Sequence, residues 1–248
     1  MARFSISAAS VLPFISFPSL AGPPLATEDP GILDEGQWEI ITATTATAAD
    51  GDNVYQAPVL DISLGVIEDY VQFAVAYPYV FSDPEDSDSN SDFGNPEVGI
   101  KWRFWNSRDL QVAFAPVYAF GVTRSLAVLG IGDDTNSLTL PLSAEYKFNN
   151  RLRLNPSLGY VSVEDGEDEW TYSAALLYSL NSRWELLGEL VGATNTHFDE
   201  DILDVRIGFD FAIREDFHLL FSAATGLSEP SGEDGLDYDF YLGLQWFR

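Results

Sequence analysis

Residues 236–248 read LDYDFYLGLQWFR, and their hydropathy alternates with a period of two. One face carries the large apolar and aromatic side chains, namely Leu236, Tyr238, Phe240, Leu242, Leu244 and Trp246. The other face carries Asp237, Asp239, Tyr241, Gly243, Gln245 and Phe247. Such alternation predicts a β-strand with one apolar face and one mixed, more polar face.

About twelve segments with this pattern follow one another along the chain, each long enough to be a membrane-spanning strand. They are expected at residues 36–47, 53–65, 68–80, 95–105, 109–121, 136–148, 151–162, 169–180, 183–194, 202–212, 215–225 and 236–248. The sequence therefore predicts an all-β fold, a single antiparallel transmembrane β-barrel.

The connections between these segments fall into two alternating classes. Tight turns are expected at Val66-Ile67, Asn106-Ser107-Arg108, Asn149-Asn150, Asn181-Ser182 and Arg214-Glu215. Longer, acidic loops are expected at residues 48–52, 81–94, 122–135, 163–168, 195–201 and 226–235. Short periplasmic turns and long external loops are typical of outer-membrane barrels.

Aromatic residues concentrate near both ends of the expected strands, and nearly all lie on the apolar face. Trp102 and Phe104 lie near a tight turn, whereas Tyr77 and Tyr79 lie near a long loop. Two aromatic girdles on an outward apolar band indicate a membrane barrel. A soluble β-sandwich shares the alternation, but its apolar core gives no reason for girdles.

Composition excludes several function classes. The 248 residues include 39 acidic and only 12 basic side chains, for a formal net charge of −27. A nucleic-acid partner bound through a basic patch is therefore not expected. The absence of cysteine excludes thiolate catalysis and Cys-ligated zinc. No enzyme activity and no cofactor are predicted, since phosphate-binding loops and nucleophile elbows are missing.

The N-terminus has the pattern of a secretory signal. Arg3 precedes a short apolar run, and Ser19 and Ala21 supply the small residues before a cleavage site after Ala21. We therefore expect a signal peptide at residues 1–21 and a barrel at residues 36–248. Residues 22–35 between them form a Pro-containing segment that is either periplasmic or a plug of the lumen. The predicted location is the outer membrane of a Gram-negative bacterium.

The more polar face of each strand would line the barrel lumen. Its charged residues are the candidates for solute selectivity: Glu39, Asp61, Glu97, Lys101, Arg103, Glu145, Lys147, Arg153, Glu185, Glu189, Asp204, Arg206, Asp210 and Asp239. Opposed charges could simply pair and hold a filled lumen. They could instead form a selectivity path for small or cationic solutes. Barrel size alone does not decide between a pore and a closed barrel.

The acidic loops offer two weaker signals. Asp86, Asp88, Asn90, Asp92 and Glu97 fall at the spacing of a calcium loop, although Ser91 replaces the usual glycine. A solvated acidic loop that meets lipopolysaccharide through divalent ions is the alternative. The two histidines give little evidence of catalysis: His197 lies among loop acids, and His218 lies on an inward face.

The last strand resembles the C-terminal signal that the barrel-assembly machinery reads. Tyr241, Gly243 and Trp246 fit that signal, and Arg248 occupies the place of its final aromatic residue. The expected partners are therefore this machinery, outer-membrane lipid and lipopolysaccharide, together with a small-molecule solute.

Five short stretches follow one another along the chain: residues 24–29 (PLATED), 36–39 (GQWE), 76–79 (AYPY), 99–104 (GIKWRF) and 158–160 (LGY). In these stretches and their order, the chain resembles a family of outer-membrane proteins named for the meta pathway (MetA-pathway) of phenol degradation. The resemblance implies a barrel that moves small molecules across the outer membrane.

The expected function is a channel for passive passage of small solutes, with hydrophobic or aromatic and cationic ones as candidates. The alternative is a non-conducting structural or adhesive barrel whose acidic loops bind ions or a partner.

Overall fold

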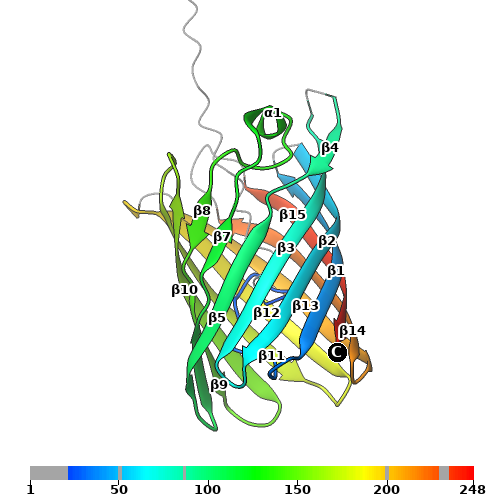
Figure 1. The fold of residues 1–248 in the computed structure, drawn as a ribbon, viewed down its shortest axis with the longest axis vertical. Helices are drawn as coiled ribbons and strands as arrows, with labels where there is room; N and C mark the ends of the chain where they lie inside the picture. Colours follow the sequence, from blue (N-terminus) through cyan, green and yellow to red (C-terminus); the bar gives the residue numbers. More distant parts are fainter. Residues whose placement is uncertain (1–21, 50–51, 86–87, 199–200, 229–234) are drawn as a thin grey trace, which may run out of the picture.

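The computed structural model describes residues 22–49, 52–85, 88–198, 201–228 and 235–248. These residues form one closed antiparallel sheet (Figure 1). Its elements are β1 (Trp38–Ala49), β2 (Asp52–Ile67), β3 (Val71–Asp83), β4 (Asn90–Phe93), β5 (Glu97–Asn106), β6 (Leu110–Phe114), β7 (Val117–Ala119), α1 (Arg124–Ala127), β8 (Ser137–Thr139), β9 (Leu142–Lys147), β10 (Leu152–Val163), β11 (Glu169–Ser179), β12 (Trp184–Asn195), β13 (Asp201–Arg214), β14 (Phe217–Ser228) and β15 (Leu236–Phe247).

The barrel closes because β1 pairs with β15 in antiparallel register, from Glu39 opposite Phe247 to Ala49 opposite Leu236. At the lower end of this seam between β1 and β15, the amide of Trp38 donates to the Arg248 carbonyl and the amide of Arg248 donates to the Trp38 carbonyl, both at 2.8 Å. Closure leaves no free edge across the membrane, which is the condition for a sheet to span lipid.

Two strands of the barrel wall are interrupted at a proline, so that each is divided into two shorter elements. Pro116 separates β6 from β7, and Pro141 lies between β8 and β9. The carbonyl groups of both prolines still accept ladder bonds of 3.1 Å, from Ile100 and Ala115 respectively. Each pair therefore forms one strand of the barrel wall, while β4 pairs only with β3, beside its upper residues Tyr79 to Ser82 (Figure 1). With β6 and β7 counted as one strand, β8 and β9 counted as one strand, and β4 left out, the described residues form a wall of twelve strands. This confirms the predicted antiparallel barrel.

One predicted turn is wrong. Val66 and Ile67 do not form a turn, because β2 continues through Ile67, which pairs with Val71. The chain instead reverses over residues 68–70, where Asp69 adopts a left-handed φ of 68°. The physical reason is that β-branched residues favour the pleated strand, whereas aspartate tolerates the left-handed region.

The alternation of the sequence becomes an outward apolar surface. Large side chains such as Trp102 (52% exposed) and Ile207 (66% exposed) face away from the lumen. Ring pairs lie near the tight turns, for example Trp102 with Phe104 and Tyr146 with Phe148. In the described part of the chain, no helix is both long and apolar enough to cross a membrane.

Candidate functional site

The candidate site is the barrel interior, whose wall is polar although it is buried. Opposite the outward apolar residues, the strands bury these polar and charged side chains: Asp61, Ser63, Gln72, Arg103, Ser143, Glu145, Asn155, Glu189, Asp204, Arg206 and Ser222. Burial of charge is costly unless the charge is paired or hydrogen-bonded. The partners of these groups therefore determine what the lumen can hold.

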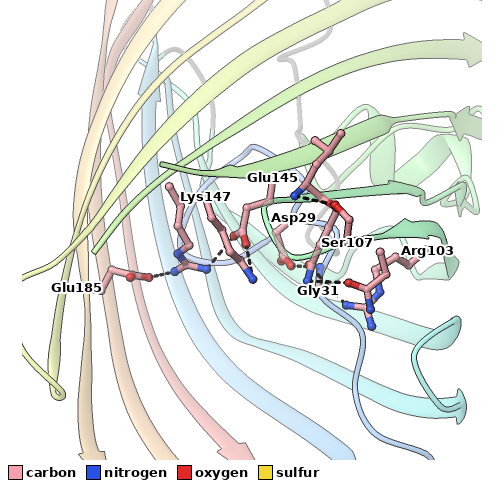
Figure 2. A network of polar contacts seen from close by, with 11 residues as sticks. Asp29, Gly31, Arg103, Ser107, Glu145, Lys147 and Glu185 are labelled. Atoms are coloured by element: carbon pink, nitrogen blue, oxygen red, sulfur yellow. Dashed lines mark hydrogen bonds and ion pairs between the residues drawn. The ribbon is translucent and has the colours of Figure 1, made fainter. Parts of the chain in front are cut away.

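A first charged network lies near the tight turns and joins the four strands β9 to β12 (Figure 2). Arg153 on β10 contacts Glu145 at 2.8 Å and Glu185 at 2.5 Å. Lys147 approaches the other oxygen of Glu145 at 3.4 Å, and the Ser179 hydroxyl donates to Glu185 at 2.7 Å. These contacts balance two carboxylates against two cations, so the network is close to neutral.

A second network lies around Arg206 on β13. Its guanidinium contacts Asp239 at 2.6 Å and Glu189 at 3.4 Å, and it donates to the Ser222 hydroxyl at 3.1 Å. The Thr47 hydroxyl donates to the other oxygen of Asp239 at 2.7 Å. Arg206 is 7% exposed and Glu189 is 2% exposed, so this is a desolvated cluster.

Arg103, predicted as a lumen-lining base, pairs with a turn residue. Its guanidinium contacts the Asp69 carboxylate at 2.7 Å, and its Nε donates to the Asp69 carbonyl at 3.0 Å. Both bonds hold the left-handed turn between β2 and β3. Its charge is therefore paired at the lower rim, and sequence spacing gave no signal for this partner.

The N-terminal segment, defined here as residues 22–37, crosses the lumen. The Glu189 carboxylate accepts hydrogen bonds from the backbone of Ala26 (3.1 Å) and Thr27 (2.5 Å). The Ser222 hydroxyl donates to the Pro24 carbonyl at 2.6 Å. Leu25 packs against an apolar cluster of inward residues on β11 and β12. These contacts place one end of the segment on the wall formed by β11 to β14.

The other end of the segment is anchored to the opposite wall. Lys101 on β5 contacts Glu28 at 2.5 Å and Asp29 at 3.7 Å, and the Leu33 amide donates to the Gln72 side chain at 3.1 Å. Lower down, Gly65 accepts from the Gly36 amide at 2.9 Å and donates to the Gln37 carbonyl at 3.0 Å. The segment thus runs from the barrel interior down to the lower rim, where the chain enters β1.

A cavity of about 70 Å³ remains between this segment and the wall. Its charged lining consists of Glu28, Asp29, Glu39, Asp61 and Lys101. Glu39 accepts a 2.7 Å hydrogen bond from Gln245. Among the described residues, Asp61 Oδ1 is buried without a hydrogen-bond partner. Carboxylates outnumber cations here, unlike in the Arg153 network.

The remaining predicted lumen residues are distributed as follows. Asp210 lies 2.8 Å from His218 Nδ1, so it is paired near the lower rim. Asp204 is 8% exposed, and its Oδ1 has no hydrogen-bond partner within the described chain. Glu97 begins β5 and is half-buried. Sequence reasoning did not single out Gln72, Ser222 and Glu28 as site residues, because the candidates were limited to charged side chains of the expected strands.

The other predicted sites stay predictions. Asn90 and Asp92 lie in β4, opposite Ser82 and Val80, while Asp86 lies outside the described residues. No group of three or more His, Cys, Asp or Glu side chains in the described ranges could hold a metal ion. In the proposed assembly signal, Trp246 is on the outward face, whereas Tyr241 packs inward against the Ile41 cluster.

Residues 24–233 match the protein family described as "Putative MetA-pathway of phenol degradation". The chain belongs to this family. The match covers most of the chain and confirms the resemblance seen in the motifs around residues 24–29 and 99–104. No curated protein sequence gives a significant match.

Several solved structures share the fold of this family member. The COG4313 outer membrane channel from Pseudomonas putida F1 has a TM-score of 0.67 at 13% identity, over 89% of this chain and 97% of that one. The NanC porin has a TM-score of 0.60 at 7% identity, over 84% and 98% of the two chains. The KdgM porin, solved with disordered oligogalacturonate, has a TM-score of 0.57 at 10% identity, also over 84% and 98%. At these identities the likeness establishes the fold, that of outer-membrane channels.

Proposed function

We propose that this protein is a channel of the Gram-negative outer membrane for passive passage of small solutes, with a preference for neutral and cationic ones. The observation that carries the proposal is the excess of carboxylates on the inward face of a closed barrel. The lumen-facing candidates comprise nine acids and five bases. The likeness to channels and porins of the same fold supports this role without naming the solute.

The pairing pattern supports a cation preference. Arg153, Arg206 and Arg103 each contact at least one carboxylate, so these bases present little free positive charge to a solute. Asp61 and Asp204 each keep a buried oxygen without a hydrogen-bond partner among the described residues. Walls of low dielectric focus the field of such carboxylates, which attracts cations and repels anions.

The N-terminal segment would limit the size of the solute and the rate of passage. It contacts both walls, through Glu189 on one side and Lys101 on the other. A backbone that crosses the lumen removes much of the free cross-section. In this proposal, residues 22–37 act as the constriction of the channel, and passage requires either the residual space beside the segment or its displacement.

The test is planar-bilayer recording of the refolded mature protein under a salt gradient. Unitary currents with a cation-selective reversal potential are expected, and removal of residues 22–36 is expected to raise the unitary conductance. A truncation retains the barrel strands, so folding can be checked independently by heat-modifiable gel mobility. A folded barrel that carries no current, with or without the segment, would contradict the proposal and favour a structural or adhesive barrel.

A further inference from the structure

The acidic cavity lies beside the residue that processing is predicted to make the first of the mature chain. Gly22 lines the cavity together with Glu28, Asp29 and Asp61. The Gly22 amide donates to the Thr27 carbonyl at 3.3 Å, and the Leu25 amide donates to the Gly22 carbonyl at 3.1 Å. A tight turn over residues 22–27 therefore holds Gly22 at the cavity.

The charge of this cavity is unbalanced. Four carboxylates line it, those of Glu28, Asp29, Glu39 and Asp61, and Lys101 is the lining cation. Lys101 is already engaged by Glu28 at 2.5 Å and lies 3.7 Å from Asp29. Asp61 is only 5% exposed, and Oδ1 has no hydrogen-bond partner in the described part of the chain. A buried carboxylate oxygen without a partner is costly, and a cationic group beside it would offset this cost.

We propose that the cavity binds the chain's own α-ammonium group, created at Gly22 by removal of the signal peptide. Hydrolysis of the Ala21–Gly22 peptide bond consumes one water, releases the Ala21 carboxylate with the signal, and leaves a protonated amine on Gly22. This amine can keep its hydrogen bond to the Thr27 carbonyl. Its additional N–H groups can donate hydrogen bonds to carboxylates of the cavity. Processing would thereby complete the anchoring of the N-terminal segment.

The local geometry fits a small, unhindered N-terminal residue. A Cβ atom at position 22 would meet Asp29 Oδ2 at 2.8 Å and the Thr27 carbonyl at 3.0 Å. The Asp29 carboxylate therefore packs directly against Gly22, close to where the new charge arises. Any other residue at this position would push Asp29 away. The inference rests on the predicted cleavage after Ala21, and it holds whether or not the barrel conducts.

The test measures the chemical reactivity of the mature N-terminus. The chain has only two lysines, Lys101 and Lys147, so acetylation of Gly22 is easily resolved by peptide mass spectrometry. The refolded protein is treated with a limiting amount of an acetyl ester at pH 7, beside a urea-unfolded sample. An α-amine has an ordinary pKa of about 8, and carboxylate neighbours favour its protonated, unreactive form. We expect Gly22 to be acetylated at least tenfold more slowly in the folded protein.

Two variants separate charge pairing from simple shielding. Asp61→Asn removes the carboxylate whose Oδ1 has no partner among the described residues, and should restore Gly22 acetylation several-fold. Asp204→Asn is the matched control, because Asp204 is also buried with an unpartnered oxygen but does not line this cavity. Its Gly22 reactivity should equal that of the unmodified sequence. A mature chain that starts elsewhere, equal rates in the folded and unfolded proteins, or no effect of Asp61→Asn would each overturn the proposal. None of these readouts depends on conductance.

Discussion

Glu189 accepts a hydrogen bond of 2.5 Å from the backbone amide of Thr27, 162 positions earlier in the chain. The same carboxylate accepts from Ala26 and lies 3.4 Å from the Arg206 guanidinium. One wall residue thus joins the N-terminal segment to the charged network that holds β12 to β15 together. Its two contacts can be tested separately.

Glu189→Gln is expected to loosen the N-terminal segment. A neutral amide keeps one acceptor but loses the charge-assisted bonds to Ala26 and Thr27, which are about twice as strong as neutral ones. The variant should show larger or more frequent open currents in bilayer recordings. Glu185→Gln is the matched control, since it removes an equal inward charge that contacts Arg153 rather than the segment. Equal gating in both variants would contradict the anchoring role of Glu189.

Gly65→Ala tests the lower attachment of the segment. A Cβ at Gly65 would collide with the Asp34 carbonyl and come within 2.6 Å of the Leu33 carbonyl, so these residues could not stay in place. We expect cleavage within residues 22–37 by added protease to accelerate at least tenfold, while the barrel stays folded. Gly188→Ala provides the control, because its Cβ would meet no atom within 4 Å. Unchanged protection in Gly65→Ala would mean that the segment does not depend on this contact.

Arg206→Ala is expected to destabilise the barrel. The arginine is 7% exposed, and its removal leaves Asp239 and Glu189 without their cation. Loss of one partner from a buried ionic cluster costs about 3–5 kcal/mol in the free energy of unfolding. Urea unfolding in lipid vesicles measures this loss.

The comparison for Arg206 is Arg214→Ala. Arg214 pairs with Asp216 at 3.1 Å, but its side chain is 65% exposed. Exposed pairs contribute at most about 1 kcal/mol. A comparable loss of stability in both variants would show that the Arg206 cluster is not desolvated in solution.

The loop between β10 and β11 should respond to acid through Asp168. The Tyr160 hydroxyl donates to its carboxylate at 2.6 Å and the Val163 amide at 3.1 Å, and these bonds lower the pKa of Asp168. Because the folded pKa is depressed, the stabilisation is present above the ordinary aspartate value and is lost as the pH falls through the lowered one. Carboxylate NMR titration should show a low midpoint that Tyr160→Phe raises. An unchanged midpoint would contradict this arrangement.

The barrel was predictable because alternation in a membrane strand is a local property. In segments such as residues 236–248, the alternation shows which side chains face lipid. The lengths of the connections show which of them lie at the same end of the barrel. The prediction failed at Val66-Ile67, where two β-branched residues extend the strand and the reversal uses Asp69 instead. Turn chemistry alone did not reveal that Arg103 would hold this turn from the next strand.

The lumen was only partly predictable. Periodicity assigned Glu189, Asp61 and Arg206 to the inward face, where the structure buries them. It could not assign partners, because these depend on the register between strands that are far apart in sequence. The path of residues 22–37 lay beyond any periodic argument, since a segment without regular structure is placed by contacts such as that of Pro24 with Ser222.

The seam between β1 and β15 has a consequence for the order in which the protein is built. β1 follows directly after Gln37, and its partner strand ends at Phe247, at the last positions of the chain. The ring can therefore shut only once β15 has been made. The residues that lie inside it precede β1 in the chain, and they must already be folded inward when the seam forms or be threaded through an end afterwards. Barrel assembly thus has to enclose the N-terminal segment. If β1 and β15 paired while that segment was still outside, the barrel would close without it.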